Sequence, residues 1–197
     1  MPGQRYAMVI DVRRCIGCQA CAVACKSENA VPLSVWRGWL KIVEKGTFPN
    51  VSRPILPLLC NNCANPICVR NCPTQATYQR QDGIVMVDPH RCIGCKYCIA
   101  SCPYDVRHLN PMKKIVQKCQ WCHHRLDAGL QPACANTCPT SAMIFGDLDD
   151  PESEVSRALA THAVQVLKPE KDTRPQVYYI GADQAAMRTM GTVGGGE

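Results

Sequence analysis

The chain has 197 residues, of which 46% are hydrophobic, and its formal net charge is +6. Its best apolar run, 55–59, contains a proline and is far shorter than the roughly 18 residues that cross a bilayer, so we expect no transmembrane segment of its own. The hydrophobic fraction also includes 16 cysteines, so the ordinary apolar core is thin and bound metal groups should supply much of the folding free energy.

The N-terminal segment, 1–10, leads directly into the first cysteines and has neither the apolar region nor the cleavage site of a signal peptide. Arg13 and Arg14 resemble a twin-arginine export signal in isolation, but Cys15 follows them at once. If the chain is exported, we therefore expect a partner protein to carry the export signal.

The cysteines fall into four groups of four, with none left over. The groups are Cys15/Cys18/Cys21/Cys25, Cys60/Cys63/Cys68/Cys72, Cys92/Cys95/Cys98/Cys102 and Cys119/Cys122/Cys134/Cys138. The third group matches the bacterial ferredoxin run C-x2-C-x2-C-x3-C-P without a departure. Because sixteen thiolates are what four [4Fe–4S] clusters require, we predict that all sixteen cysteines are cluster ligands.

Zinc and disulfide bonds are the two alternatives for so many cysteines. A zinc site is usually built from pairs of C-x-x-C separated by longer loops, whereas these quartets are spaced to wrap a larger inorganic core. Gly17 and Gly94 have no Cβ, so the backbone can approach a bulky cluster and turn its amides toward the sulfides. Disulfides within such tight quartets would be strained. The spacing therefore favours iron–sulfur clusters.

Between the first two groups, 31–59 is expected to form strands and loops that pack against an outer module built from groups one and four. Its tryptophans Trp36 and Trp39 are expected to be buried cover for clusters, with contact to a partner as the alternative. Between the second and third groups, two short apolar runs joined by Asp82 and Gly83 predict the internal hairpin of a ferredoxin repeat.

The fourth group is irregular because eleven residues separate Cys122 from Cys134, and we expect them to form a surface loop. The loop contains His123 and His124. Since sixteen thiolates already complete four clusters, we expect these histidines to have ordinary surface or hydrogen-bonding roles.

The C-terminal part predicts one helix and one strand. Asp150 as N-cap and Pro151 at the first position predict the helix start, and Val155 and Leu159 form an apolar pair one turn apart. The apolar segment 177–180 predicts a final strand, and 191–197 is expected to be a disordered tail.

In a two-cluster ferredoxin the fourth cysteine of each group ligates the other cluster. Groups two and three flank the predicted hairpin and form an inner module. The residues that precede group one resemble those that precede group three, and the residues that follow group four resemble those that follow group two. Groups four and one are therefore expected to form an outer module around the inner one. The predicted ligand sets are Cys15/Cys18/Cys21/Cys138, Cys60/Cys63/Cys68/Cys102, Cys92/Cys95/Cys98/Cys72 and Cys119/Cys122/Cys134/Cys25.

The expected fold class is α+β, with two nested bacterial-ferredoxin-like modules, small strands, short helices and many loops. We expect 1–59 plus 103–150 to form the outer module and 60–102 the inner one. The remainder, 151–197, is expected to hold the C-terminal helix, strand and tail.

The positive net charge does not indicate a nucleic-acid partner. Each oxidised cluster with four thiolates carries roughly −2, which brings the formal charge of +6 to about −2. We expect basic side chains beside the ligands to offset this buried negative charge. These residues are Arg13, Arg14, Arg91, Lys96, Lys118 and Arg125.

No catalytic motif accompanies the cysteines: the sequence has no Ser/His/Asp arrangement, phosphate-binding loop or dinucleotide fingerprint. We therefore expect a non-catalytic subunit whose chemistry is done by another polypeptide. Four redox centres in one chain indicate electron transport.

Further motifs lie outside the cysteine groups. Cys-Pro-Thr follows groups two and four, Arg-His-Leu-Asn-Pro occupies 107–111, and Phe-Gly-Asp-Leu-Asp-Asp-Pro occupies 145–151. With these motifs, from Tyr6 to about Ile180, the chain resembles the iron–sulfur subunit of the dimethyl-sulfoxide-reductase family of complex iron–sulfur molybdoenzymes, especially the polysulfide, thiosulfate, tetrathionate and arsenate reductase branch.

The resemblance implies an anaerobic respiratory oxidoreductase in which four [4Fe–4S] clusters relay electrons between an integral-membrane quinone-binding subunit and a molybdopterin catalytic subunit. Some relatives replace one cysteine of the third group by tryptophan, whereas Cys98 is present here. The resemblance also implies a position at the bacterial inner membrane through a partner subunit; it favours the periplasmic face, with export alongside a partner, and leaves the cytoplasmic face open. Two alternatives remain: the iron–sulfur subunit of a formate dehydrogenase or hydrogenase complex, and a zinc-binding interaction module.

Overall fold

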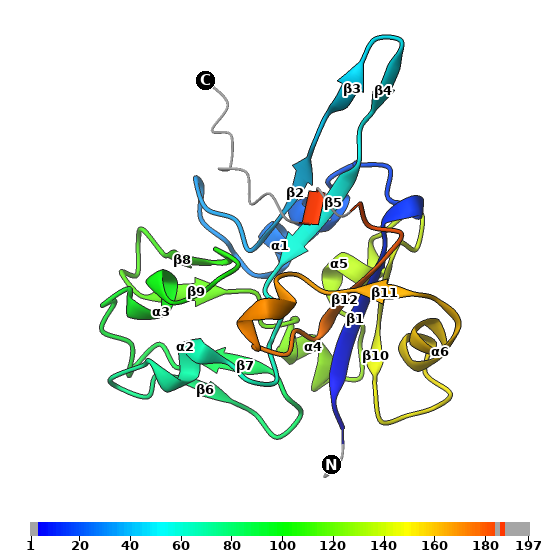
Figure 1. The fold of residues 1–197 in the computed structure, drawn as a ribbon. Helices are drawn as coiled ribbons and strands as arrows, with labels where there is room; N and C mark the ends of the chain where they lie inside the picture. The colour runs from blue at the N-terminus through cyan, green and yellow to red at the C-terminus, as the bar shows by residue number, and fades with distance from the viewer. Residues whose placement is uncertain (1–3, 184–185, 188–197) are drawn as a thin grey trace.

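The structure is a computed structural model that describes residues 4–183 and 186–187, with mixed strands and short helices (Figure 1). The strands are β1 (Tyr6–Asp11), β2 (Gly38–Ile42), β3 (Lys45–Thr47), β4 (Asn50–Ser52), β5 (Ile55–Leu59), β6 (Thr77–Gln79), β7 (Val85–Val87), β8 (Arg107–Leu109), β9 (Val116–Lys118), β10 (Met143–Asp147), β11 (Val164–Gln165) and β12 (Val177–Ile180). The helices are α1 (Ala20–Glu28), α2 (Ile67–Arg70), α3 (Tyr97–Ala100), α4 (His123–Leu126), α5 (Ala133–Asn136) and α6 (Glu154–Thr161), with 3-10 turns η1 (Val12–Arg14) and η2 (Pro169–Lys171).

The largest sheet has the strand order β10-β1-β12-β11. Its strand β1 is apolar along most of its length because both of its faces are covered. Ala7 and Val9 pack against α6, whereas Met8 and Ile10 point to the opposite face and join the main core. All four side chains are fully buried, as the two-residue period of a strand between two layers requires. The predicted strand at 177–180 is confirmed as β12.

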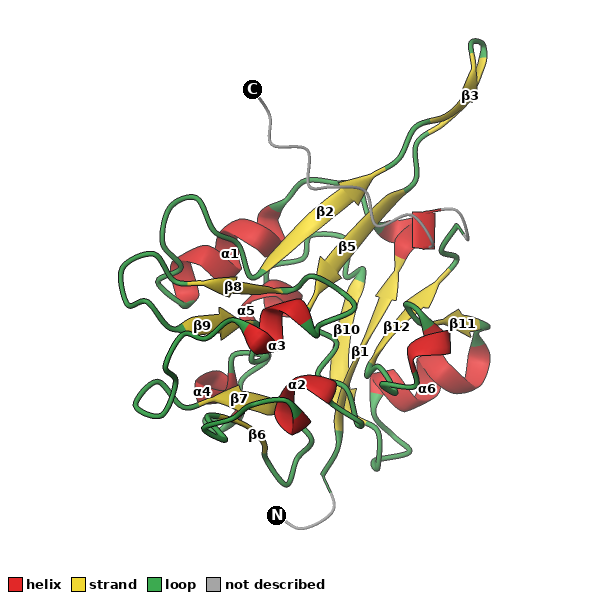
Figure 2. Ribbon diagram, turned by 60° about the vertical axis from the view of Figure 1, so that its left-hand side comes forward, coloured by secondary structure: helices red, strands yellow, loops and turns green. Residues whose placement is uncertain are grey.

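Four antiparallel strand pairs connect the cysteine groups in series. The pairs β2–β5, β6–β7 and β8–β9 each join the residues after one group to the residues before the next, and β10–β1 joins the exit of group four to the approach of group one. The hairpin predicted around Asp82 and Gly83 is confirmed as β6–β7. Figure 2 shows β6 to β9 with α2 and α3 on one side of the molecule, and the large sheet with α6 on the other.

The segment 31–59 packs on the rest of the chain only in part. Leu56 and Leu58 of β5 are buried in the main core, but the β3–β4 hairpin projects away from the body of the molecule (Figures 1 and 2). Phe48 at its turn is 92% exposed. The expectation that the whole segment packs against the outer module was therefore wrong for this hairpin.

The main core combines a few large side chains with cysteines. Trp121 is 1% exposed and meets the ring of Phe145 edge-on at 5.3 Å, and Phe145 stacks on Tyr6 at 5.2 Å. Cys60 and Cys119 belong to the same buried cluster. The apolar core and the cysteine groups are thus one continuous interior, as the composition indicated.

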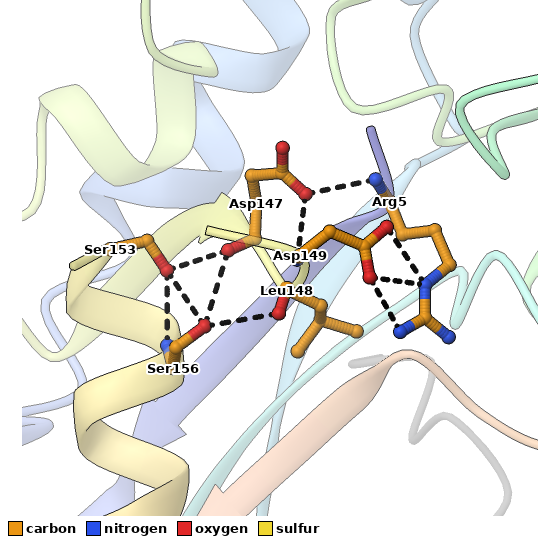
Figure 3. A network of polar contacts seen from close by, with 6 residues as sticks. All are labelled: Arg5, Asp147, Leu148, Asp149, Ser153 and Ser156. Carbon is orange, nitrogen blue, oxygen red and sulfur yellow. Dashed lines mark hydrogen bonds and ion pairs between the residues drawn. The ribbon is translucent and has the colours of Figure 1, made fainter. Parts of the chain in front are cut away.

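Helix α6 begins later than the sequence predicted. Its N-cap is Ser153, whose Oγ accepts a hydrogen bond from the backbone N–H of Ser156 (3.1 Å) and donates to the backbone oxygen of Asp147 (2.6 Å), as Figure 3 shows. Asp150 accepts from the backbone N–H of Glu152 in the preceding turn, so its assignment as N-cap was wrong. The serine hydroxyl can cap the helix and bind the end of β10 at once, which a carboxylate cannot do because it has no proton to donate.

The predicted tail, 191–197, lies outside the described residues. Among residues 4–183 and 186–187, no helix combines the length and apolar character needed to span a bilayer.

Replacing the N-cap serine tests this account of α6. Ser153→Ala removes the hydrogen bonds to Ser156 and Asp147, and we expect a loss of about 1 kcal/mol of stability. Hydrogen exchange of the cluster-loaded protein under anaerobic conditions should show faster exchange in 154–161. Ser153→Thr keeps the hydroxyl and serves as the control. Equal exchange in Ser153→Ala and the unaltered protein would contradict the assignment.

Candidate iron–sulfur cluster sites

The loops that carry the cysteines share a backbone pattern that turns the polypeptide around a centre. In groups one and three, Gly17 (φ +73°) and Gly94 (φ +69°) are each followed two residues later by a left-handed residue, Gln19 or Lys96. A Cβ on Gly94 would lie 2.4 Å from the backbone oxygen of Lys114, so glycine is required there by both conformation and space. The short helices α1 and α3 then start just before the third cysteine of their groups.

Each predicted ligand set is named after its first cysteine. The sets are the Cys15 set (Cys15, Cys18, Cys21, Cys138), the Cys60 set (Cys60, Cys63, Cys68, Cys102), the Cys92 set (Cys92, Cys95, Cys98, Cys72) and the Cys119 set (Cys119, Cys122, Cys134, Cys25).

Two of these sets each surround one cavity with all four cysteines. The Cys15 set lines one cavity, and the Cys60 set lines another. In each case three cysteines come from one group and the fourth from a different group.

The Cys119 set is brought together less completely. Cys25, Cys119 and Cys134 line a third cavity, but the fourth cysteine on its wall is Cys21. Cys122 approaches from outside this lining: the side-chain amide of Asn29 lies 3.5 Å from its sulfur and 3.7 Å from that of Cys25.

The Cys92 set is the least defined by contacts. The thiol of Cys98 interacts electrostatically with Cys72 and also with Cys68. The sulfur of Cys92 accepts a hydrogen bond from the backbone N–H of Val116 (3.4 Å). The grouping of Cys92 and Cys95 with the other two stays a prediction.

The two Cys-Pro-Thr motifs direct hydrogen bonds at their cysteine sulfurs. Cys72 accepts from the backbone N–H of Thr77 (3.4 Å), and Cys138 accepts from that of Ala142 (3.3 Å). Burial alone would raise the pKa of both thiols, but these bonds and the hydroxyl of the motif's threonine outweigh it, so each pKa is lowered. Donors aimed at sulfur favour the thiolate, which is the form that binds iron.

The other cysteine thiols whose pKa is shifted have it raised. Burial, followed by repulsion from neighbouring cysteines, raises the pKa of Cys21 to about 11 and that of Cys63 to about 12. Burial also raises the pKa of Cys25 to about 11. Four converging buried thiolates need positive charge at their centre, and the irons of a [4Fe–4S] cluster supply it. The donor sets therefore fit this cofactor.

One buried cation contacts the Cys60 set, and a second interacts with it electrostatically. The guanidinium of Arg107 is 4% exposed and donates to the sulfur of Cys68 at 2.9 Å. Lys118 is fully buried. Of the six basic residues that the sequence placed beside ligands, Lys118 alone is buried, and Arg13 instead pairs with Asp11 at 2.8 Å. The sequence reasoning missed Arg107, although its position in a short strand just after group three was the available signal.

The histidines and tryptophans have mixed outcomes. His124 makes a surface contact with Glu28 (2.7 Å), as expected of a non-ligand. Trp39 is half-buried and lines the cavity beside Cys25, whereas Trp36 is 43% exposed, with the ammonium of Lys26 4.2 Å from its ring centre. The prediction that both tryptophans are buried was wrong for Trp36.

A matched pair of glycine variants tests the loop geometry. Gly94→Ala forces a Cβ against a backbone oxygen, and we expect the protein to lose about a quarter of its iron because one cluster loop can no longer close. Gly83→Ala also has positive φ but meets no atom within 4 Å, so it should keep its iron at a strain of about 1–2 kcal/mol. Iron analysis of anaerobically purified protein decides, and equal iron in both variants would refute the steric argument.

Comparison with known proteins agrees with these sites. Residues 51–148 match the model of a 4Fe-4S dicluster domain, and residues 14–29 match that of a 4Fe-4S binding domain. A tetrathionate reductase subunit of Salmonella typhimurium is 50% identical over 188 residues, covering 93% of this chain and 75% of that protein. A polysulfide reductase polypeptide of Wolinella succinogenes is 41% identical over 180 residues, covering 90% of this chain and 94% of that protein.

A third relative extends the range of reductases. The arsenate respiratory reductase iron–sulfur subunit of a Shewanella species is 36% identical over 225 residues, covering 89% of this chain and 96% of that protein. The sixteen cysteines and the matching domains agree on four [4Fe–4S] clusters. The chain therefore belongs to the iron–sulfur electron-transfer subunits of the molybdoenzyme reductases.

Proposed function

We propose that the sixteen cysteines bind four [4Fe–4S] clusters as the four crossed sets, and that the chain relays electrons one at a time along them. The observation that carries this proposal is the composition of the cavities: the Cys15 set and the Cys60 set each combine three cysteines of one group with the fourth of another. The clusters supply the one-electron redox chemistry. The protein's part is to hold them in series and to exclude solvent from the middle of the series.

The electrostatic interactions between cysteines of different sets support one linear order. Cys98 of the Cys92 set interacts electrostatically with Cys68 of the Cys60 set. Cys60 in turn interacts with Cys119, and Cys21 of the Cys15 set interacts with Cys134 of the Cys119 set. The proposed order is therefore the Cys92 set, the Cys60 set, the Cys119 set and the Cys15 set.

Burial of the cysteines supports the same order. Cys95 and Cys18, which belong to the two terminal sets, are exposed. Cys60, Cys119 and Cys122, which belong to the two inner sets, are buried, and so is Cys98 of the terminal Cys92 set, which interacts with the neighbouring Cys60 set. Redox partners would reach the series at its two ends, because the inner sets lie behind protein.

The crossed sets also support the nested arrangement of modules. In this proposal 60–102 forms the inner module, 1–59 plus 103–150 forms the outer one, and 151 onward forms a C-terminal addition. The pair β6–β7 lies within the inner module, and β1–β10 is the corresponding pair of the outer module.

The partners are inferred from the family. By name, each of the three relatives above belongs to a reductase. We infer that this chain works in an anaerobic respiratory reductase, between an integral-membrane quinone-binding subunit and a molybdopterin catalytic subunit. In this proposal the chain is peripheral, held at the bacterial inner membrane by the quinone-binding subunit, on the periplasmic face.

Alanine variants of third and fourth cysteines test the crossed ligation. If the sets are correct, Cys102→Ala and Cys68→Ala remove the same cluster signal, and Cys72→Ala and Cys98→Ala remove a different one. Electron paramagnetic resonance spectra of the reduced variants make the comparison directly. Uncrossed ligation predicts the other pairing, in which Cys68→Ala matches Cys72→Ala, and that result would reject the sets.

A single ligand change tests the relay. Cys98→Ser should convert or remove one terminal cluster and abolish quinol-dependent turnover of the assembled complex. An artificial reductant that donates directly to the catalytic subunit should still support turnover, because that subunit is unaltered. Undiminished quinol-dependent turnover would show that electrons do not need this position.

A further inference from the structure

Three basic side chains are buried in the part of the chain that the structure describes: Arg37 (8% exposed), Arg107 (4%) and Lys118 (0%). The buried acidic side chain there is Asp11, which pairs with Arg13 at the surface. A buried cation without a counter-ion is strongly destabilising, so each of these three needs negative charge from elsewhere.

Arg107 and Lys118 are direct cross-strand neighbours. They face each other in the register of the β8–β9 hairpin and therefore lie on the same face of that two-stranded sheet. Like charges directly opposite each other in a sheet repel, and burial strengthens the repulsion. Such a pair is stable only beside a compensating negative group.

The hydrogen bonds of the two side chains contain no carboxylate among the described residues. Arg107 donates to the sulfur of Cys68 (2.9 Å) and to the hydroxyl of Thr77 (3.4 Å). Lys118 donates to the side-chain oxygen of Asn62 (3.1 Å), to the backbone oxygen of Cys119 (2.8 Å) and to that of Val85. Apart from one sulfur, every acceptor is a neutral oxygen.

Both cations act on the Cys60 set, from different directions. Arg107 lines its cavity and interacts electrostatically with Cys60, Cys68 and Cys102, and also with Cys98 of the neighbouring Cys92 set. Lys118 interacts with Cys68 and with Cys119 of the next set in the proposed order. The Cys60 set is the one that both cations share.

We propose that Arg107 and Lys118 together raise the reduction potential of the cluster held by the Cys60 set. This inference rests on the proposed ligand sets. Reduction adds one electron and no proton, and takes the cluster with its thiolates from a charge of roughly −2 to roughly −3. Two fixed positive charges in a dry interior stabilise the reduced form more than the oxidised form, and without them the electron would be held less tightly at this position.

Redox titration followed by electron paramagnetic resonance tests the proposal on the complete cluster-loaded chain. Arg107→Met and Lys118→Met remove charge while keeping much of the side-chain volume. One midpoint potential should fall in both variants, with at least a tenfold change in the equilibrium for reduction, which is 59 mV for one electron. Cys102→Ala, which should lose this cluster, identifies the signal. Arg157→Met, an exposed change on α6, should leave all four potentials unchanged.

The charge-conserving variants Lys118→Arg and Arg107→Lys separate charge from shape. They should keep the midpoint potential close to that of the unaltered protein. A methionine variant can fail to hold the cluster. In that case, a cluster retained in the charge-conserving variant at the same position supports the proposal, and a cluster lost in both variants overturns it. Unchanged potentials in both methionine variants also overturn it. If the proposed function itself were wrong, the unaltered protein would hold fewer than four clusters. Unchanged potentials in a protein with four intact clusters therefore overturn this inference alone.

Discussion

The structure depends on placing several negatively charged clusters inside a chain of 197 residues with few large apolar side chains. Each cluster with four thiolates carries roughly −2, and a charge of that size is unstable in a low-dielectric interior unless donors and cations surround it. The hydrogen bonds from Thr77 and Ala142 to cysteine sulfurs stabilise this negative charge locally. The buried side chains of Arg107 and Lys118, which have no acidic partners in the described part of the chain, stabilise it at longer range. The same clusters fill the space that an ordinary protein of this size fills with aliphatic side chains.

The sequence predicted the chemistry of the site better than its surroundings. Cysteine spacing is a covalent property of the polypeptide, so ligand candidates, the β6–β7 hairpin and β12 could be predicted from local patterns. The start of α6 could not, because Ser153 is favoured over Asp150 by a hydrogen bond to the backbone oxygen of Asp147 at the end of β10, and this bond forms only once the turn between them has its folded shape. The exposure of Trp36 likewise depends on where the loop after α1 runs, and a large aromatic residue alone favours burial.

Arg107 shows why electrostatic residues are hard to find from sequence. Charge next to a cysteine in the sequence predicted six candidates, but sequence proximity selects side chains that project to solvent as readily as those that point inward. Register decides between these directions. Arg107 and Lys118 are brought together by the pairing of β8 with β9, which the sequence analysis did not predict, since three-residue strands give too short a pattern for alternation to be read.

The spacing of the last two cysteines in every group explains why the sets form a series. Cys21 and Cys25 lie one helical turn apart within α1, and the other three groups repeat this separation of four residues. Within α1 this spacing puts both cysteines on one helix face at about 5–6 Å. In the other three groups the third cysteine lies in a short helix and the fourth lies two residues beyond its end. Crossed ligation would therefore place two clusters beside each such pair of cysteines. In the proposed arrangement, no such pair of cysteines joins the inner module to the outer one. That junction instead depends on packing around Asn62, whose side-chain oxygen accepts from both Lys118 and the backbone of Val85. The junction that lacks a shared pair of cysteines is thus the place where the protein buries Lys118. This one side chain can hold the proposed modules together through Asn62 and also place a positive charge beside the junction.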